Sequence, residues 1–432
     1  MTADLNYMSG FGNEFATEAI KGALPVGRNS PQKPPLGLYA EQLSGTAFTA
    51  PNNMNQRTWF YRIQPSVVHS RYRKLPNTLW MTAPDAAGIN TPEQLRWDPQ
   101  PIPTKPTNFW QSITTVCSNG GAAGMGGIGI HLYCFNAPMK NQAMMNHDGD
   151  FLLIPQEGTL TIRTEMGLME VVPGEIAVVQ RGIKFQVQHS GKFARGYIGE
   201  NYGSHFELPY RGPIGSNGLA NPRDFLTPVA AFQDQTADWE IIARFQGELF
   251  VTDMKRCPFD VVGWHGNYAP YKYNLDHFNT INTVSFDHPD PSIFTVLTSA
   301  TSVPGTANCD FVIFPPRWMV ATETFRPPWY HRNVMSEYMG LIKGVYDAKP
   351  AGGGFSPGSG SLHNCMSAHG PDAEAFTAAT NATLKPDFYA NTMAFMLESN
   401  CPYKLSKFAM EGGLLQSNYL ECWAGLKPHF KV

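Results

Sequence analysis

Side chains that could bind a metal ion gather in the second half of the chain. His331 and Glu337 stand six residues apart in RPPWYHRNVMSEYMGLI, and His363 and His369 follow in SLHNCMSAHGPD. Two histidines and one carboxylate are the ligand set of non-haem Fe(II) oxygenases, in which the ion keeps open positions for substrate and dioxygen. The pattern favours a mononuclear iron site, although ordinary polar residues would fit the spacing alone equally well.

The spacing of His331 and Glu337 sets a condition on the chain between them. On a straight strand, residues six apart share a face but are separated by about 20 Å. Ligands of one ion lie within about 4 Å of each other, so the chain must bend if both bind it. Arg332 and Asn333 are a suitable place, because Asn tolerates turn conformations. Either His363 or His369 could be the third ligand, and the spacing leaves this choice open.

A fourth histidine, His288, lies in the segment SFDHPDPS. Its neighbours Asp287 and Asp290 would favour the protonated imidazole. A histidine accepts and releases protons near neutral pH and can therefore serve as a general base. A structural loop histidine is the alternative interpretation.

The elements that must position these residues are mostly strands. Aromatic and β-branched runs alternate with Gly, Pro, Asn and Asp, as in residues 151–179 and 311–325. Such runs are typical of a β-sandwich or barrel. Helical signals are few: a cap with an early proline at residues 90–96, and helix formers at 372–379. Residues 238–250 fit a helix or a strand. We predict a mainly β fold with few short helices.

The length and composition of the chain limit its possible domain organisation and partners. A chain of 432 residues exceeds one ordinary core, so we expect two domains, residues 1–280 and 281–432. Charged residues make up only 16%, which favours burial of surface between subunits in a homo-oligomer. The net charge of −3 argues against nucleic acid as a partner.

Targeting and cysteine patterns indicate a cytoplasmic protein. No stretch approaches the roughly 20 apolar residues of a membrane span. The N-terminus lacks the basic start and apolar run of a signal peptide. The 7 cysteines include no CxxC pair, which argues against a disulfide framework or a zinc ribbon.

The first half resembles the cupin superfamily. NHDGDFLLIPQEGTLTI at residues 146–162 and PGEIAVVQRGIKF at 173–185 are similar to its two motifs. The metal-binding pattern is broken, because the first motif holds a single histidine, His147, and Phe185 replaces a ligand histidine. We therefore predict a metal-less, structural barrel in this half, with His147 as a polar turn residue.

The chain as a whole resembles the homogentisate 1,2-dioxygenase family. The similar segments run from the first residues nearly to the end: YMSGFGNEF (7–15), LYAEQLSGTAFTAP (38–51), WHGNYAPYKYNL (264–275), FDHPDPSIFTVLT (286–298), FVIFPPRW (311–318), PPWYHRNVMSEYMGLIKG (327–344) and HGPDA (369–373). The resemblance implies a two-part cupin-like jelly-roll architecture, a cytosolic homo-oligomer built from trimers, and Fe(II). It also implies conversion of homogentisate and O₂ to 4-maleylacetoacetate in tyrosine and phenylalanine catabolism.

The same resemblance assigns roles to single residues. It places the iron ligands at His331, Glu337 and His369, and an acid/base role at His288. It places Tyr346 and His363 in or beside the substrate site, which His369 also borders. A donor for the substrate carboxylate is not assigned, and the candidates by residue type are Arg332, Lys343 and Tyr133. Two alternatives remain open: a cupin dioxygenase for another hydroxylated aromatic acid such as gentisate, and a non-enzymatic bicupin.

Overall fold

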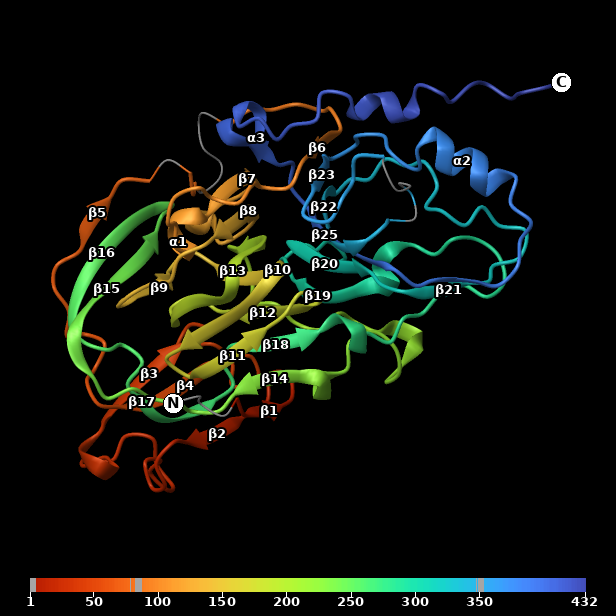
Figure 1. Cartoon of the computed structure of the whole chain (residues 1–432). Coiled ribbons are helices and arrows are strands. Elements are labelled where there is room, and N and C mark those ends of the chain that lie inside the picture. Colours follow the sequence, from red (N-terminus) through yellow and green to blue (C-terminus); the bar gives the residue numbers. More distant parts are fainter. Residues whose placement is uncertain (1–4, 78, 82–87, 347, 349–352) are drawn as a thin grey trace.

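The computed structural model describes residues 5–77, 79–81, 88–346, 348 and 353–432, and its chain is mainly β (Figure 1). The described α-helices are short: α1 (Phe109–Ser112), α2 (Ala373–Thr380) and α3 (Lys407–Glu411). The prediction of strands with few short helices is therefore confirmed. The ambiguous residues 238–250 form strands, in β15 and the start of β16.

The largest sheet is built mostly from the first half of the chain. Its path runs through β1 (Tyr7–Ser9), β14 (Phe225–Pro228), β18 (Tyr271–Asn274), β12 (Glu175–Val179), β10 (Asp150–Thr164), β13 (Lys184–Asn201), β9 (Gln142–Asn146), β15 (Thr236–Phe245), β16 (Glu248–Arg256) and β5 (Arg73–Leu75). The other members are β11 (Gly167–Val171), β8 (Ile128–Phe135), β7 (Thr114–Ser118) and β26 (Lys404–Leu405). The long strands β10 and β13 pair antiparallel at its centre, broken by bulges near Glu157.

Two smaller sheets complete the set of sheets in the described chain. One contains β2 (Phe15–Glu18), β17 (Val261–Gly266), β4 (Arg57–Arg62) and β3 (Tyr39–Ser44). The other pairs β21 (Arg317–Met319) with β24 (Asp387–Tyr389).

A six-stranded sheet carries Glu337 and His363, two of the residues considered as metal ligands. Its order is β19 (Thr295–Ser299), β20 (Cys309–Phe314), β25 (Thr392–Ser399), β22 (Ser336–Gly344), β23 (Gly360–His363) and β6 (Leu95–Trp97). Both faces of β22 are buried over most of its length. Gly340 is needed there, because a Cβ at this position would lie 2.3 Å from the ring of Phe395 on β25.

The edge strand β6 corrects one prediction. Residues 90–96 were expected to begin a helix, but Leu95–Trp97 form a strand that pairs with β23 (Figure 1). Leu95 and Trp97 are buried in the core shared by the two large sheets. Burial and strand pairing thus override a weak local cap signal. The second helix prediction is confirmed, since α2 begins after Asp372, whose Oδ1 accepts a hydrogen bond from Ala375 N at 2.8 Å.

One hydrophobic core joins the largest sheet to the six-stranded sheet. Tyr197 of β13 lies at this junction, with its ring 4.9 Å from that of Phe395 and its hydroxyl donating to the Ser359 carbonyl at 2.8 Å. Strands also cross the predicted boundary near residue 280: β6 joins the later sheet and β26 the earlier one. The division into 1–280 and 281–432 stays a prediction.

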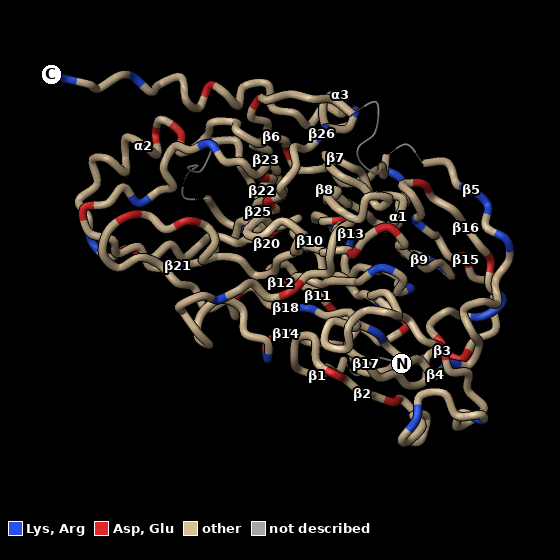
Figure 2. Tube along the Cα trace, turned by 180° about the vertical axis from the view of Figure 1, so that it is seen from behind, with Lys and Arg blue, Asp and Glu red and all other residues tan. Residues whose placement is uncertain are grey.

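Charged residues are spread along the whole trace rather than gathered on one face (Figure 2). Within the described part of the chain, no helix combines the length and apolar character that a membrane crossing requires.

Candidate metal centre

Two of the candidate ligands face each other across a short antiparallel bridge. The backbone N–H of His331 donates to the His369 carbonyl at 2.9 Å, and the N–H of His369 donates to the His331 carbonyl at 3.1 Å. Their rings are 4.2 Å apart between centroids. The backbone therefore fixes both histidines side by side, although they come from segments far apart in the sequence.

Glu337 reaches the same place because the chain bends after His331. The bend falls at Val334 and Met335, directly after the Arg332–Asn333 pair that was predicted to hold it, and β22 begins at Ser336. Asn333 stabilises the turn, because its Oδ1 accepts a hydrogen bond from Met335 N at 3.1 Å. The condition set by the six-residue spacing is met.

The ligand atoms of His331, Glu337 and His369 lie within 4.8 Å of one another. Nε2 of His331 is 3.8 Å from one carboxylate oxygen of Glu337, and Nε2 of His369 is 3.0 Å from the other. Among the described residues this is the one cluster of three or more histidine, cysteine or acidic side chains with such geometry. It matches two-histidine, one-carboxylate coordination of a divalent ion.

The imidazole tautomers suit metal binding. Nδ1 of His331 lies 2.7 Å from the Trp329 carbonyl, and Nδ1 of His369 lies 2.9 Å from the Ser367 carbonyl. A carbonyl only accepts, so each Nδ1 donates to its carbonyl, and each Nε2, the atom that would bind a metal ion, faces Glu337. Backbone carbonyls thus orient both rings.

Charge in the cluster favours an ionised carboxylate. Burial alone would raise the pKa of Glu337, but hydrogen bonds with His331 and His369 outweigh it and hold that pKa well below its ordinary value. The hydrogen bond with Glu337 raises the pKa of His331, against burial, which lowers it. A cation bound between the three side chains would replace the protons of the hydrogen bonds that Glu337 makes with the two histidines.

Two further carboxylates lie in the same cross-strand row. Glu337 pairs with Glu398 across β22 and β25, and Glu398 pairs with Asp310 across β25 and β20. Burial and then repulsion from Glu337 raise the pKa of Glu398 to about 7. Asn333 links the row, since its Nδ2 donates to Glu337 Oε1 at 3.0 Å and also to Glu398 Oε1. Sequence reasoning missed both carboxylates, because only the strand register brings them to the site.

The two candidates for the third ligand occupy different positions. Nε2 of His369 points to Glu337, whereas Nε2 of His363 lies 2.8 Å from the Tyr419 hydroxyl. The two imidazole rings stack with centroids 4.0 Å apart. His363 therefore lies beside the cluster, where it supports the ring of His369.

A cavity of about 520 Å³ opens onto the cluster and is lined by residues that include His288, Trp329 and Tyr346. Nδ1 of His288 lies 2.9 Å from the Pro289 carbonyl, which places its basic lone pair on Nε2. Its ring meets Trp329 edge-on at 5.7 Å. Tyr346 packs against Phe314 with ring centroids 5.4 Å apart. The structure therefore brings His288, Tyr346 and His363 together with the three candidate ligands.

The three candidates for binding the substrate carboxylate lie in different parts of the structure. Arg332 lines the cavity. Tyr133 does not, because it is fully buried in another core beside Phe109 and Phe135. Lys343 points away and lies 3.5 Å from Asp276 at the surface. Arg96 of β6, which sequence reasoning did not consider, lines the cavity as well.

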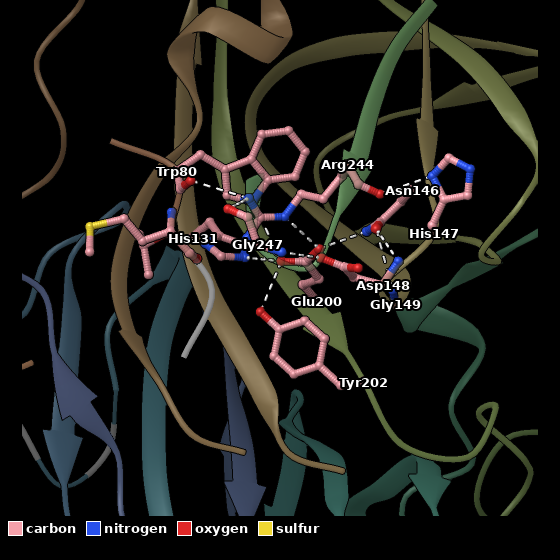
Figure 3. A network of polar contacts seen from close by, with 12 residues as sticks. Trp80, His131, Asn146, His147, Asp148, Gly149, Glu200, Tyr202, Arg244 and Gly247 are labelled. Carbon is pink, nitrogen blue, oxygen red and sulfur yellow. Dashed lines mark hydrogen bonds and ion pairs between the residues drawn. The ribbon is translucent and has the colours of Figure 1, made fainter. Parts of the chain in front are cut away.

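A second polar cluster lies inside the first half (Figure 3). Glu200 Oε1 accepts hydrogen bonds from Asn146 at 2.7 Å and Arg244 at 3.1 Å. Its Oε2 lies 3.0 Å from both His131 Nε2 and the Tyr202 hydroxyl. The carboxylate is thus saturated by protein donors, as expected of a structural network.

The residues of the broken cupin motifs lie around this network. His147 Nδ1 lies 3.0 Å from the Arg244 carbonyl (Figure 3). Phe185 is buried in the apolar core, with its ring 5.9 Å from that of Phe151.

Comparison with known proteins identifies the family. The family model described as homogentisate 1,2-dioxygenase N-terminal matches residues 6–275, and its C-terminal counterpart matches residues 276–430. Homogentisate 1,2-dioxygenases of Rhodopseudomonas palustris strains BisA53 and BisB18 are each 55% identical over 98% of this chain and 94% of their own length. A cupin 2 conserved barrel domain protein from Leptotrichia buccalis, 8% identical, matches 74% of this chain and 99% of its own with a TM-score of 0.26. From the two family models and these full-length relatives, the chain belongs to the homogentisate 1,2-dioxygenase family.

Proposed function

We propose that this chain opens the aromatic ring of homogentisate with O₂, giving 4-maleylacetoacetate, at one ferrous ion held by His331, Glu337 and His369. The observation that carries the proposal is the convergence of their ligand atoms within 4.8 Å in a chain of this family. Both oxygen atoms enter the product, so no external reductant is consumed. The reaction would belong to tyrosine and phenylalanine catabolism.

The donor set fits iron. Two neutral imidazoles and one carboxylate bind one side of a divalent ion and leave the other side open to the cavity. When bound, the ion would supply adjacent positions for a ring hydroxyl and dioxygen and would lower the pKa of that hydroxyl, which is about 10 when free. The residues of the chain then have two tasks, which are to move this proton and to hold the ring in place.

His288 is the residue placed to take the proton. Its Nδ1 is committed to the Pro289 carbonyl at 2.9 Å, so Nε2 is the atom that accepts the ring-hydroxyl proton and later returns it. The edge of Trp329 restricts how the imidazole can turn. General acid–base catalysis of this kind contributes about 10²- to 10⁴-fold to a rate.

Tyr346 and His363 would orient the substrate. Tyr346 is held between Phe314 and Phe355, with ring centroids 5.4 Å and 6.1 Å away, and it lines the cavity. His363 stacks on His369 and shares a short contact with Tyr419. Rigid placement of this kind lets two reactants meet on one centre at little entropic cost.

The same family supports a cytoplasmic homo-oligomer, a trimer or a hexamer made of two trimers. The low charged fraction of 16% is consistent with surface buried between subunits.

Oxygen uptake tests the proposed activity. The purified chain, supplied with Fe(II) and ascorbate, should consume one O₂ per homogentisate and form the ultraviolet-absorbing product. Glu337→Ala should abolish both signals, whereas Glu248→Ala, an exposed site on β16, should not. Turnover of gentisate in place of homogentisate would favour the alternative dioxygenase, and no uptake with any such acid by iron-loaded protein would refute the enzymatic proposal.

A further inference from the structure

Arg96 is a buried cation in the wall of the candidate active site. It lies on β6, opposite Ser361 of β23, and only 3% of it is exposed. It lines the cavity onto which the metal cluster opens. Burying a guanidinium costs free energy unless hydrogen bonds and a negative charge compensate it.

The compensation of Arg96 is incomplete. Its Nε donates to Gln416 Oε1 at 2.5 Å, and its guanidinium carbon lies 4.3 Å from the centroid of the Tyr419 ring. Its Nη1 is buried and has no hydrogen-bond acceptor among the described residues. No carboxylate of the described chain forms an ion pair with it, although the charges of Asp98 and Asp372 are near enough to act on it. The group is therefore held by neutral partners while a donor remains unused.

The sheet order places Arg96 at a useful distance from the metal cluster. Glu337 lies on β22, and β23 and β6 follow it in the sheet. Adjacent strands are about 4.8 Å apart, and Arg96 is in register with Met339, two residues along β22 from Glu337, so the two backbones are about 12 Å apart. A ring hydroxyl and the carboxylate on a one-carbon side chain of the same ring span a shorter length, and the long side chain of Arg96, which lines the same cavity, can cover the rest.

The charged residues that the six-stranded sheet contributes to the cavity favour one orientation of an acidic substrate. Asp310 and Glu398 lie on β20 and β25, on one side of Glu337, and would repel an anion. His363 and Arg96 lie on the other side, on β23 and β6. An aromatic acid would therefore direct its carboxylate toward Arg96.

We propose that Arg96 binds the side-chain carboxylate of the aromatic substrate through Nη1 and so selects acids over neutral hydroquinones. Gln416 and Tyr419 hold the guanidinium in place. The Tyr419 hydroxyl also contacts Nε2 of His363, which connects Arg96 to the metal cluster. The inference rests on the proposed function, because it assumes that a dihydroxyphenyl acid occupies the cavity. Arg332, which also lines the cavity but is exposed, is the rival anchor.

Steady-state kinetics with a matched pair of substrates tests the proposal. Homogentisate carries a carboxymethyl group, and methylhydroquinone has a methyl group in place of that group. In Arg96→Met, the KM for homogentisate should rise about 30- to 100-fold, as for loss of a charge-assisted hydrogen bond, while the KM for methylhydroquinone stays within about twofold. Arg73→Met, an exposed site on β5, is the control.

Arg96→Lys tests whether a folding defect, and not the lost contact, explains the result for Arg96→Met. It keeps the charge but loses the planar fork, so anaerobic titration should show weaker homogentisate binding and unchanged methylhydroquinone binding, at wild-type iron content and melting temperature. Equal losses for both ligands, or the acid-specific loss in Arg332→Met instead, would overturn the proposal. Failure of wild-type protein to consume homogentisate would instead refute the proposed function, so the two failures are distinguishable.

Discussion

Nε2 of His369 lies 3.0 Å from Oε2 of Glu337, so a residue at the start of one strand meets a residue from a loop 32 positions later. If both bind one ion, removal of either side chain removes the site. His369→Ala should therefore retain less than about a tenth of the wild-type iron and show no oxygen uptake. Metal analysis after gel filtration, with circular dichroism to confirm folding, measures this.

His363→Gln is the matched variant for this experiment. It alters the ring stacked on His369 but leaves the three ligands in place. We expect it to retain iron and to lose turnover, because His363 lies beside the substrate. The reverse result, with iron lost in His363→Gln and kept in His369→Ala, would exchange their roles.

Asn333 is expected to control the affinity of the metal site without being a ligand. Its Nδ2 donates to Glu337 Oε1 at 3.0 Å, and its Oδ1 caps the bend. Groups that orient a metal ligand are worth about 10- to 100-fold in metal affinity. Asn333→Ala should weaken iron binding by that factor, measured by competition with a chelator, and excess Fe(II) should restore turnover. Unchanged affinity would show that the turn orients Glu337 without this hydrogen bond.

The candidate site was largely predictable because its chemistry is local. His331 and Glu337 are close in sequence, and the need for a bend followed from strand geometry, although the bend lies one residue beyond the predicted pair. Long segments shared with a known family indicated His369 over His363. Helix α2 was predictable because helix formers fill residues 372–379, and the structure adds a cap by the side chain of Asp372.

The rest depended on pairing between distant segments. Arg96 became a cavity residue because β6 adds to β23, and nothing in residues 90–96 signals that pairing. Glu398 and Asp310 face the site only through strand register. Tyr133 was chosen by residue type, which cannot distinguish a substrate donor from a tyrosine packed against Phe109.

His288 is expected to affect the rate and not the metal. It lines the cavity with Nε2 as its basic nitrogen, but it is outside the ligand cluster. His288→Gln keeps a similar shape without a base, so kcat should fall by about 10²- to 10⁴-fold while iron content stays at the wild-type level. Stopped-flow traces of single turnovers would locate the slow step. A wild-type kcat in His288→Gln would show that His288 takes no part in the proton transfer.

The buried network around Glu200 predicts how the fold responds to acid. Burial would raise the pKa of Glu200, but Arg244 and then the hydrogen bond with His131 lower it from 4.5 to about 2. A carboxylate with a depressed pKa stabilises the fold fully above its unfolded value, and this contribution disappears as the pH falls from 4.5 toward 2. The shift corresponds to a contribution of about 3 kcal/mol.

Glu200→Gln should therefore unfold more easily than wild type near neutral pH, because Arg244 loses its buried counter-charge (Figure 3). The difference should shrink as the pH is lowered below 4.5, since protonation of Glu200 removes the same charge from wild type. Thermal melting at a series of pH values measures both effects. Glu248→Gln, at an exposed pair with Lys74, should follow the wild-type curve throughout. A constant difference between Glu200→Gln and wild type across this pH range would show that the network stabilises the fold by shape and hydrogen bonding rather than by charge.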